Sequence, residues 1–261
     1  MDIIVCIKQV PGTTDVKINP ATNTLVREGV ESIVNPFDLY AVEEGVRLKE
    51  KLGGSVTVIT MGPPQAETAL KETISVGADA TILLSDRNFG GSDTLATAYS
   101  LARAIKKIGE YNLIICGKQA IDGDTAQVGP GIAEELKIPC VTYVKKIEEA
   151  AEDYIVVERM LDAGYQIVEV KLPALITVVK EINEPRLPSL RGKMKARKTE
   201  IPAWTAADLA CEMERIGPQG SPTAVNRIFA PPHKSSGKIL SGELPGQSAE
   251  LVKELKKLSL V

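Results

Sequence analysis

The chain of 261 residues has a single histidine, and only 4% of its residues are aromatic. One histidine, His233, excludes metal sites that need several imidazole ligands, and no hydrolase nucleophile motif lies near it. Few aromatic rings and a formal net charge of -3 give neither a stacking surface nor a basic field for a nucleic acid. We therefore expect no metal centre, no hydrolase active site and no nucleic-acid partner.

Long apolar runs and paired cysteines are also missing. No segment approaches the roughly 20 apolar residues that a membrane span needs, and the N-terminus starts a strand pattern without a secretory signal. None of the four cysteines belongs to a CxxC pair, so neither an iron–sulfur cluster nor a zinc site is indicated. We expect a cytoplasmic protein with no membrane span.

The first 145 residues alternate between strand-like and helix-like patterns. A helix is expected at 36–51, where Asn35 is a suitable N-cap, and another at 94–108, where apolar residues recur at helical spacing. Apolar strands are expected at 3–10, 56–61, 81–84 and 113–116. Strands separated by helices predict an α/β fold of the Rossmann-like, adenine-nucleotide-binding kind, with a mostly parallel sheet and helices on both faces.

The pattern changes from residue 154 onward. Runs of β-branched residues around an Asp-Ala-Gly turn predict a β-hairpin within 154–180, followed by another strand. Beyond it the periodicity fades until a final helical pattern at 248–258. We divide the chain into a nucleotide-binding α/β domain, residues 1–182, and an extended C-terminal arm, residues 183–261. Because the arm has large apolar residues but no core of its own, we expect it to dock on another surface.

Turns rich in glycine and polar residues follow the predicted strands. Because the carboxyl ends of parallel strands meet at one edge of a sheet, these turns should line a common ligand site. In the loop 117–128, Asp124 or Thr125 could cap the next helix, whose N-terminus would favour a phosphate. Such turns can also serve only to reverse the chain. The candidate cofactor-binding residues are Cys6, Lys8, Asn35, Asp38, Met61, Thr94, Gly117, Asp122, Gly123, Asp124, Thr125, Ala126, Gln127 and Val128.

Three segments resemble one known family. Residues 117–130, GKQAIDGDTAQVGP, and 156–201, VVERMLDAGYQIVEVKLPALITVVKEINEPRLPSLRGKMKARKTEI, closely resemble the β subunit of electron-transfer flavoproteins. NPFDLYAVEEGVRLKE at 35–50 fits the same family. The resemblance covers essentially the whole chain. It implies an adenine-nucleotide-binding α/β domain that forms an obligate heterodimer with a flavin-carrying α subunit.

The family has two branches that differ in the ligand of the β subunit. One branch holds AMP as a structural ligand, and the other, which bifurcates electrons, holds a second FAD. Residues 121–130 and 89–98 are similar to the bifurcating branch. The resemblance then implies that FAD accepts a hydride from NADH. Electrons would pass to ferredoxin or flavodoxin and, through the α-subunit FAD, to an acyl-CoA dehydrogenase-type enzyme. In such a site Asp93, Asp122 and Asp124 would cap helices or accept hydrogen bonds from ribose or ribityl hydroxyls.

Residues 185–190 resemble the family's recognition loop, in which a leucine anchors the redox partner. Leu190 takes the place of that leucine. Arg186, Lys193 and Lys195 are further candidates for partner binding, because basic residues can steer an acidic partner such as flavodoxin or ferredoxin. Leu190 could equally pack at the subunit interface, and the basic residues could form a solvated face.

Two functions of other classes remain open from the sequence alone. Residues 90–94, GGSDT, echo the phosphate loop of ATP pyrophosphatases, but that motif should follow the first strand, and here it follows the third. A stress-type nucleotide-binding module with no electron-transfer role would also have an α/β domain. Such a module would not need a long C-terminal arm.

Overall fold

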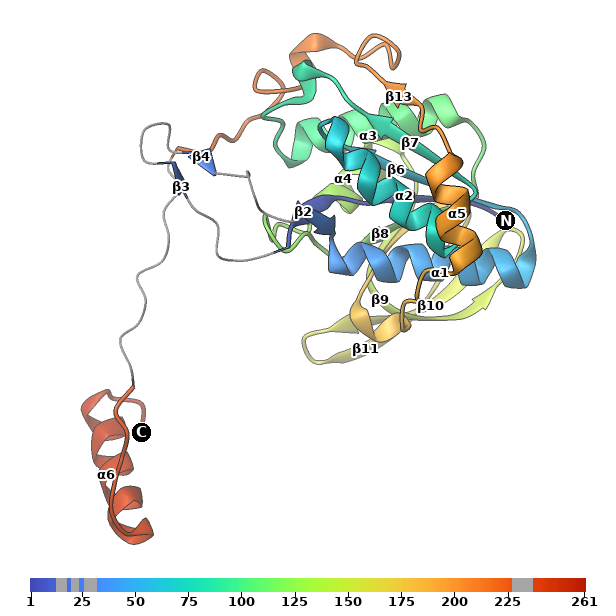
Figure 1. The fold of residues 1–261 in the computed structure, drawn as a ribbon. Helices are drawn as coiled ribbons and strands as arrows, with labels where there is room; N and C mark the ends of the chain where they lie inside the picture. The colour runs from blue at the N-terminus through green and yellow to red at the C-terminus, as the bar shows by residue number, and fades with distance from the viewer. Residues whose placement is uncertain (13–17, 20–23, 26–31, 227–236) are drawn as a thin grey trace. The chain divides into compact units, whose positions relative to one another are not determined.

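The computed structural model describes residues 1–12, 18–19, 24–25, 32–226 and 237–261. It consists of two compact units, Met1–Asn226 and Arg227–Val261. The first unit is built on a nine-stranded sheet with the order β11-β10-β9-β12-β8-β1-β6-β7-β13 (Figure 1). The strands from β9 to β13 in this order run parallel, and the β10–β11 hairpin continues the sheet in antiparallel fashion beyond β9.

Strands and helices alternate along the first part of the chain, as the sequence patterns predicted. The sheet contains β1 (Asp2–Cys6), β6 (Ser55–Met61), β7 (Ala80–Leu84), β8 (Leu113–Gly117), β9 (Cys140–Ala150), β10 (Tyr154–Leu161), β11 (Gly164–Lys171), β12 (Ala174–Val178) and β13 (Ala203–Trp204). Two short antiparallel pairs join β2 (Gln9–Pro11) to β5 (Ser32–Val34) and β3 (Ile18–Asn19) to β4 (Thr24–Leu25). The helices are α1 (Pro36–Leu52), α2 (Glu67–Val76), α3 (Thr94–Ile108), α4 (Val128–Leu136), α5 (Leu190–Lys198) and α6 (Leu244–Lys257).

Two apolar cores lie on the two faces of the sheet, which confirms the predicted α/β fold. On one face α1 and α2 pack over strand residues such as Ile3, Val5 and Ile115. On the other face α3 and α4 pack over the neighbouring residues Ile4 and Ile114. Because both faces are covered, β1 and β8 are buried along almost their whole length, as their unbroken apolar sequences predicted.

The chain beyond residue 182 continues on the same compact unit as far as Asn226. There β13 pairs with β7, and the amide of Leu83 donates a hydrogen bond to the carbonyl of Pro202 at 3.0 Å. Ile216 is buried in the core that α3 and α4 cover. The part of the predicted arm from residue 183 to Asn226 therefore packs on the α/β unit. His233 lies outside the described residues.

The second unit contains α6, and none of the residues of this helix is buried within that unit. Among the helices that the structure describes, none combines the length and the apolar character needed to cross a membrane.

Candidate functional site

The candidate site lies at the carboxyl edge of the parallel strands, where β1 and β8 end side by side. Cys6 at the end of β1 pairs in register with Cys116 of β8. The amide of Asn35 donates to the carbonyl of Lys8 at 2.8 Å, which places the start of α1 beside the exit from β1. Thr94 Oγ1 donates to Gln127 Oε1 at 2.9 Å and so joins the starts of α3 and α4. The turns that follow separate strands therefore meet here, as their positions in the sequence predicted.

Asn35 is the N-cap residue of α1 by position, but its side chain makes no capping hydrogen bond. Its Nδ2 donates to the carbonyl of Gln119 at 2.9 Å, and its Oδ1 accepts from the amide of Ile121 at 3.1 Å. The residue is only 1% exposed. Asn35 thus uses both polar atoms of its side chain to hold the loop that follows β8.

Asp38, one turn further along α1, holds the other side of this junction. Its Oδ2 accepts a hydrogen bond from the amide of Lys8 at 2.7 Å. Burial raises the pKa of the carboxyl to about 7, although hydrogen bonds from Lys8, Asn35 and Gly117 act in the opposite direction. Gly117 packs so closely here that an added Cβ would overlap both the Asp38 carboxylate and the backbone of Phe37. Glycine is therefore needed at the end of β8 for steric reasons.

The loop between β8 and α4 contains two residues in the left-handed region, Asp124 with φ 53° and Ala126 with φ 55°. This region is uncommon for residues other than glycine. The prediction that Asp124 or Thr125 caps α4 is wrong, because these turns intervene and the helix begins only at Val128. Asp124 instead accepts a hydrogen bond from the side chain of Gln119.

The N-terminus of α4 has no side-chain cap. Gln127 occupies the N-cap position, and its side chain accepts from Thr94 instead of bonding the first amides of the helix. By contrast, α3 is capped by Asp93, whose Oδ1 accepts from the amides of Leu95 and Ala96 at 2.9 and 3.2 Å. Uncapped amides at a helix N-terminus favour an anion. Of these two neighbouring helices, α4 is therefore the one suited to a phosphate.

Lys8 and Asp122 form an ion pair at the mouth of the site. Lys8 Nζ lies 2.6 and 2.7 Å from the two carboxylate oxygens of Asp122. The side chains are 47% and 34% exposed, and such exposed pairs stabilise a protein by less than about 1 kcal/mol. Lys8 can therefore exchange its partner for a phosphate at little cost. Asp122 does not cap a helix in this arrangement.

The remaining candidate residues either pack against apolar side chains or face solvent. Met61 and Val128 are partly buried and pack against the core on the α3 and α4 face. Cys6 is buried beside Cys116, and the contact with Cys6 together with burial raises the pKa of the Cys116 thiol. These two thiols therefore act as small apolar side chains beneath the site. Gly123 and Thr125 lie on the exposed part of the loop, and a Cβ on Gly123 would meet no atom within 4 Å.

Two residues near the site were not predicted from the sequence. Lys118 Nζ lies 5.8 Å from the ring centroid of Phe37 and 5.3 Å from that of Tyr143, so it adds a second cation at this edge. Tyr143 belongs to β9, whose position beside β12 depends on a pairing between distant segments. Within the part of the chain that the structure describes, no three His, Cys, Asp or Glu side chains are grouped to hold a metal ion.

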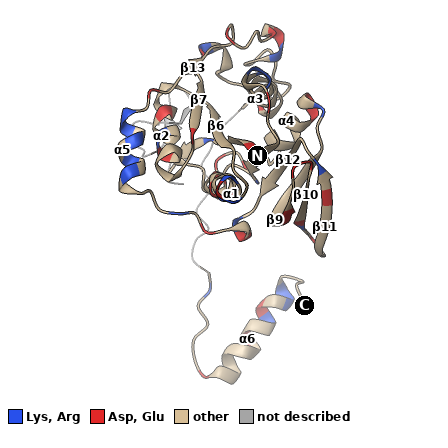
Figure 2. Ribbon diagram, turned by 90° about the vertical axis from the view of Figure 1, so that its right-hand side faces the viewer, with Lys and Arg blue, Asp and Glu red and all other residues tan. Residues whose placement is uncertain are grey.

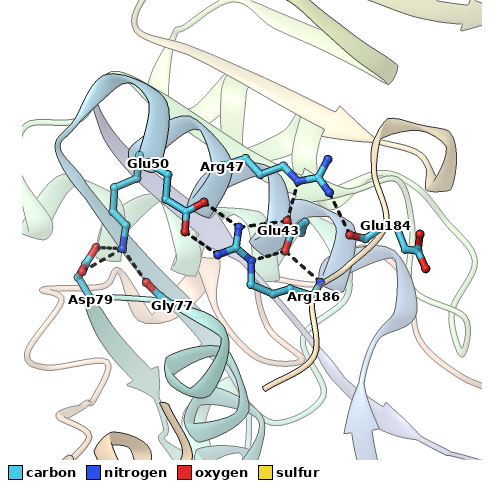
Figure 3. Close-up of polar contacts among 8 residues, drawn as sticks. Glu43, Arg47, Glu50, Gly77, Asp79, Glu184 and Arg186 are labelled. Carbon is cyan, nitrogen blue, oxygen red and sulfur yellow. Dashed lines mark hydrogen bonds and ion pairs between the residues drawn. The ribbon is translucent and has the colours of Figure 1, made fainter. Parts of the chain in front are cut away.

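The candidate partner residues lie elsewhere, and Arg186 is already occupied within the chain. Its Nε lies 2.8 Å from Glu43 Oε2, and its Nη1 lies 2.6 Å from Glu50 Oε1, both on α1 (Figure 3). Arg47 Nε reaches the second oxygen of Glu43 at 2.6 Å. Arg186 therefore fastens the start of the 186–190 segment to α1. Its role in partner binding stays a prediction.

The helix α5 carries the other candidate partner residues, and five of its nine residues are basic (Figure 2). Leu190 at its first position is 78% exposed, and Lys193 is exposed. Lys195 instead donates to the carbonyl of Ala78 at 3.1 Å and helps to hold α5 against α2. A shallow surface hollow of about 500 Å³ is lined by Leu190, Arg191, Met194, Lys195 and Lys198.

Comparison with known proteins gives consistent matches. Residues 22–209 match the family model described as the electron transfer flavoprotein domain. The chain is 50% identical over 262 residues to electron transfer flavoprotein subunit beta of Thermoanaerobacterium thermosaccharolyticum, with 100% of both chains covered. It is 48% identical over 265 residues to the subunit of the same name from Megasphaera elsdenii, covering 99% of this chain and 98% of that one. It is 47% identical over 263 residues to the caffeyl-CoA reductase-Etf complex subunit CarD of Acetobacterium woodii, with 100% of both covered.

Proposed function

Because the chain belongs to the electron transfer flavoprotein family, among its β subunits, we propose that its carboxyl-edge site binds FAD. In this proposal NADH is the hydride donor. Electrons leave to ferredoxin or flavodoxin and, through the FAD of an α subunit, to an acyl-CoA dehydrogenase-type enzyme. Family membership itself implies an α-subunit partner. The cytoplasmic location is part of the same proposal.

The uncapped N-terminus of α4 is the observation that carries the proposal. The loop in front of it is held by side chains of Asn35, Lys8 and Gln119, yet none of them caps the helix. Lys8, which follows β1, supplies a cation that contacts this loop at Asp122, and Gly123 leaves its exposed turn without bulk. A helix N-terminus, a lysine and an open turn together suit the pyrophosphate of a dinucleotide.

The chemistry of hydride acceptance and single-electron release belongs to the flavin itself, so this chain needs to bind and orient it. We assign phosphate binding to the amides of Val128 and Gly129 and to Lys8. Lys118, which lies between Phe37 and Tyr143, gives the site a further positive charge. Burial raises the pKa of Asp38 to about 7, so at neutral pH it adds less negative charge beside the ligand than an ordinary carboxylate would.

We propose that the redox partner contacts α5. The exposed Leu190 and Met194 provide an apolar strip, and the neighbouring basic side chains complement an acidic protein surface. Arg186 contributes through its attachment to Glu43 and Glu50, which sets the position of the segment before α5. The second unit, with its exposed apolar residues on α6, would dock on the α subunit.

Counting nucleotides in the purified heterodimer tests the ligand. The heterodimer is denatured, and the released FAD and AMP are separated and quantified. Two FAD per heterodimer support the proposal, whereas one FAD with one AMP would replace it by the structural-AMP function. One FAD with neither a second FAD nor AMP would contradict a nucleotide site in the β subunit.

A loop variant identifies which subunit lost its ligand. Replacing Asp124 and Thr125 by tryptophan should fill the loop and empty the β-subunit site, so one FAD per heterodimer remains. Leu187→Ala, on the exposed arm far along the chain, serves as the matched variant that retains both. Full flavin content in the tryptophan variant would contradict the assignment of this loop.

A further inference from the structure

Both polar atoms of the Asn35 side chain are engaged within the chain. Nδ2 donates to the carbonyl of Gln119 and Oδ1 accepts from the amide of Ile121, and the residue is 1% exposed. The side chain does not cap α1 either, although its position is that of the N-cap. Buried polar groups of this kind are costly unless they are paired, and the two bonds to the loop, together with the bond to Asp38, account for the presence of an amide here.

Asn35 is part of a hydrogen-bond network that joins the loop to the start of α1 and the exit of β1. Its own amide donates to the carbonyl of Lys8, and the amide of Lys8 donates to Asp38 on the same helix. Lys8 then reaches forward to Asp122, three residues beyond Gln119. The loop is therefore attached to the start of α1 at residues 119 and 121 and to the exit of β1 at residue 122.

The loop needs such attachment because two of its residues adopt an unfavourable backbone conformation. Asp124 and Ala126 have positive φ angles, which cost free energy in residues other than glycine and persist only when the surroundings enforce them. These two turns lead the chain into the uncapped N-terminus of α4 at Val128. A loop released from Asn35 would lose the geometry that presents this helix end.

We infer that Asn35 is a positioning residue, which holds the loop 119–126 in the shape that receives the nucleotide without contacting the nucleotide through its side chain. The inference rests on the proposed function of this loop as a nucleotide site. It assigns to Asn35 a task different from direct cofactor binding, which the sequence pattern alone suggested.

The main test variant is Asn35→Ser in the heterodimer. Serine is a good N-cap and keeps the start of α1 stable, but it is too short to reach Gln119 and Ile121. The matched control is Asn183→Ala. Asn183 likewise holds α1, through bonds from Nδ2 to the carbonyl of Tyr40 at 3.0 Å and to Glu44 at 2.9 Å, but neither bond involves the loop.

Two measurements separate positioning from general stability. After removal of the bound ligand, Asn35→Ser should speed hydrogen–deuterium exchange of the amides in 117–127, and Asn183→Ala should leave it unchanged. With FAD and AMP each used as a probe, Asn35→Ser should weaken the binding of the probe that the wild type takes up by about tenfold. Asn183→Ala should lower the melting temperature with no change in affinity.

The outcomes distinguish this inference from the function on which it rests. Unchanged exchange and affinity in Asn35→Ser would overturn the positioning role, as would equal losses of affinity in Asn35→Ser and Asn183→Ala. If the wild type binds neither FAD nor AMP in the β subunit, the proposed function fails, and the nucleotide part of this inference fails with it. Faster exchange in Asn35→Ser would then still establish that Asn35 holds the loop.

Discussion

Two buried carboxyl groups on α1, those of Asp38 and Glu43, have pKa values that move in opposite directions. Asp38 is 6% exposed and Glu43 is 4% exposed. Burial raises the pKa of Asp38 to about 7, and hydrogen bonds from Lys8, Asn35 and Gly117 only partly oppose it. Burial also acts to raise the pKa of Glu43, but hydrogen bonds from Arg186 and Arg47 outweigh it and hold that pKa below its usual value.

The difference lies in the partner. Asp38 meets mainly N–H dipoles, which do not offset its burial, so its pKa stays near 7 and its carboxyl carries only part of a negative charge at neutral pH. Glu43 meets two guanidinium groups, so it stays ionised and fastens the segment at Arg186 to the helix (Figure 3). One helix thus supports the ligand loop at its first turn and the partner segment along its middle. We call the first turn of α1 its ligand end and the stretch around Glu43 and Glu50 its partner end, and variants can test the two separately.

The largest effect is expected from Gly117→Ala at the ligand end. The added Cβ would overlap the Asp38 carboxylate and the Phe37 backbone, and such overpacking costs about 3 kcal/mol. Urea unfolding should show this loss. Gly123→Ala, in the same loop with open space around it, should change the free energy of unfolding by less than about 0.5 kcal/mol. Equal stability of the two variants would contradict the close packing of β8 on α1.

Arg186→Ala should have the next largest effect, at the partner end. It leaves the buried Glu43 without its main cation, which should lower the free energy of unfolding by about 2 kcal/mol. Arg47→Ala removes a half-exposed partner of the same carboxylate and should cost only about 0.5 kcal/mol. Both variants should bind the β-subunit nucleotide as the wild type does. A loss of nucleotide affinity in Arg186→Ala would show that the two ends of α1 are not independent.

Asp38→Asn should change the pH dependence of stability by a smaller amount. The pKa of Asp38 rises from 3.8 in the unfolded chain to about 7 in the fold, so the folded state retains a proton that the unfolded state has lost. Its contribution to stability is therefore complete below pH 4, declines as the pH rises to about 7, and is constant above that. Asparagine removes this decline. Relative to the wild type, the variant should gain about 1 kcal/mol between pH 6 and pH 8 in urea unfolding.

Glu43 provides the control for this pH series, because its pKa is shifted in the opposite direction. Because its pKa is lowered, its contribution is present above the unfolded pKa of 4.5 and is lost only as the pH falls through the folded value. Glu43→Gln should therefore differ from the wild type most at neutral pH and least in acid. A parallel offset of Asp38→Asn at every pH would contradict a protonated Asp38 in the native protein.

Leu190→Ala should have the smallest effect on stability, below about 0.5 kcal/mol, because the side chain is 78% exposed. It should nevertheless slow electron delivery from the heterodimer to its dehydrogenase partner and leave NADH oxidation by an artificial acceptor intact. Leu187→Ala, at an 89% exposed leucine of the same segment, should change neither rate. Equal loss in both assays for Leu190→Ala would remove the anchor role.

Much of the fold could be predicted because its signals are local. Mainly apolar runs predicted β6, β7 and β8 to within one residue of their observed ends, and Pro36 after Asn35 predicted the start of α1. The hairpin of β10 and β11 followed from its β-branched runs and turn. These features depend on neighbouring residues, and the buried positions of parallel strands are apolar on both faces.

Other elements had no local signal. The strand β9 contains a bulge at Tyr143, with φ 61°, which interrupts its alternation. The helix α5 buries only Ala196, so it shows no apolar stripe. The capping of α4 was predicted wrongly because the turns at Asp124 and Ala126 displace the helix start to Val128. Backbone turns of this kind use residues that sequence patterns assign to other conformations.

The sequence by itself determined the α/β class, the family and the set of loops that meet at the carboxyl edge, because strand order and apolar periodicity place those loops together. Only the tertiary structure decided what each polar residue does there. Asn35 hydrogen-bonds the loop instead of capping α1 with its side chain, and Arg186 forms ion pairs with Glu43 and Glu50. The physical reason is that a polar side chain bonds the groups that folding brings within about 3 Å of it, and in this site those groups come from distant parts of the chain.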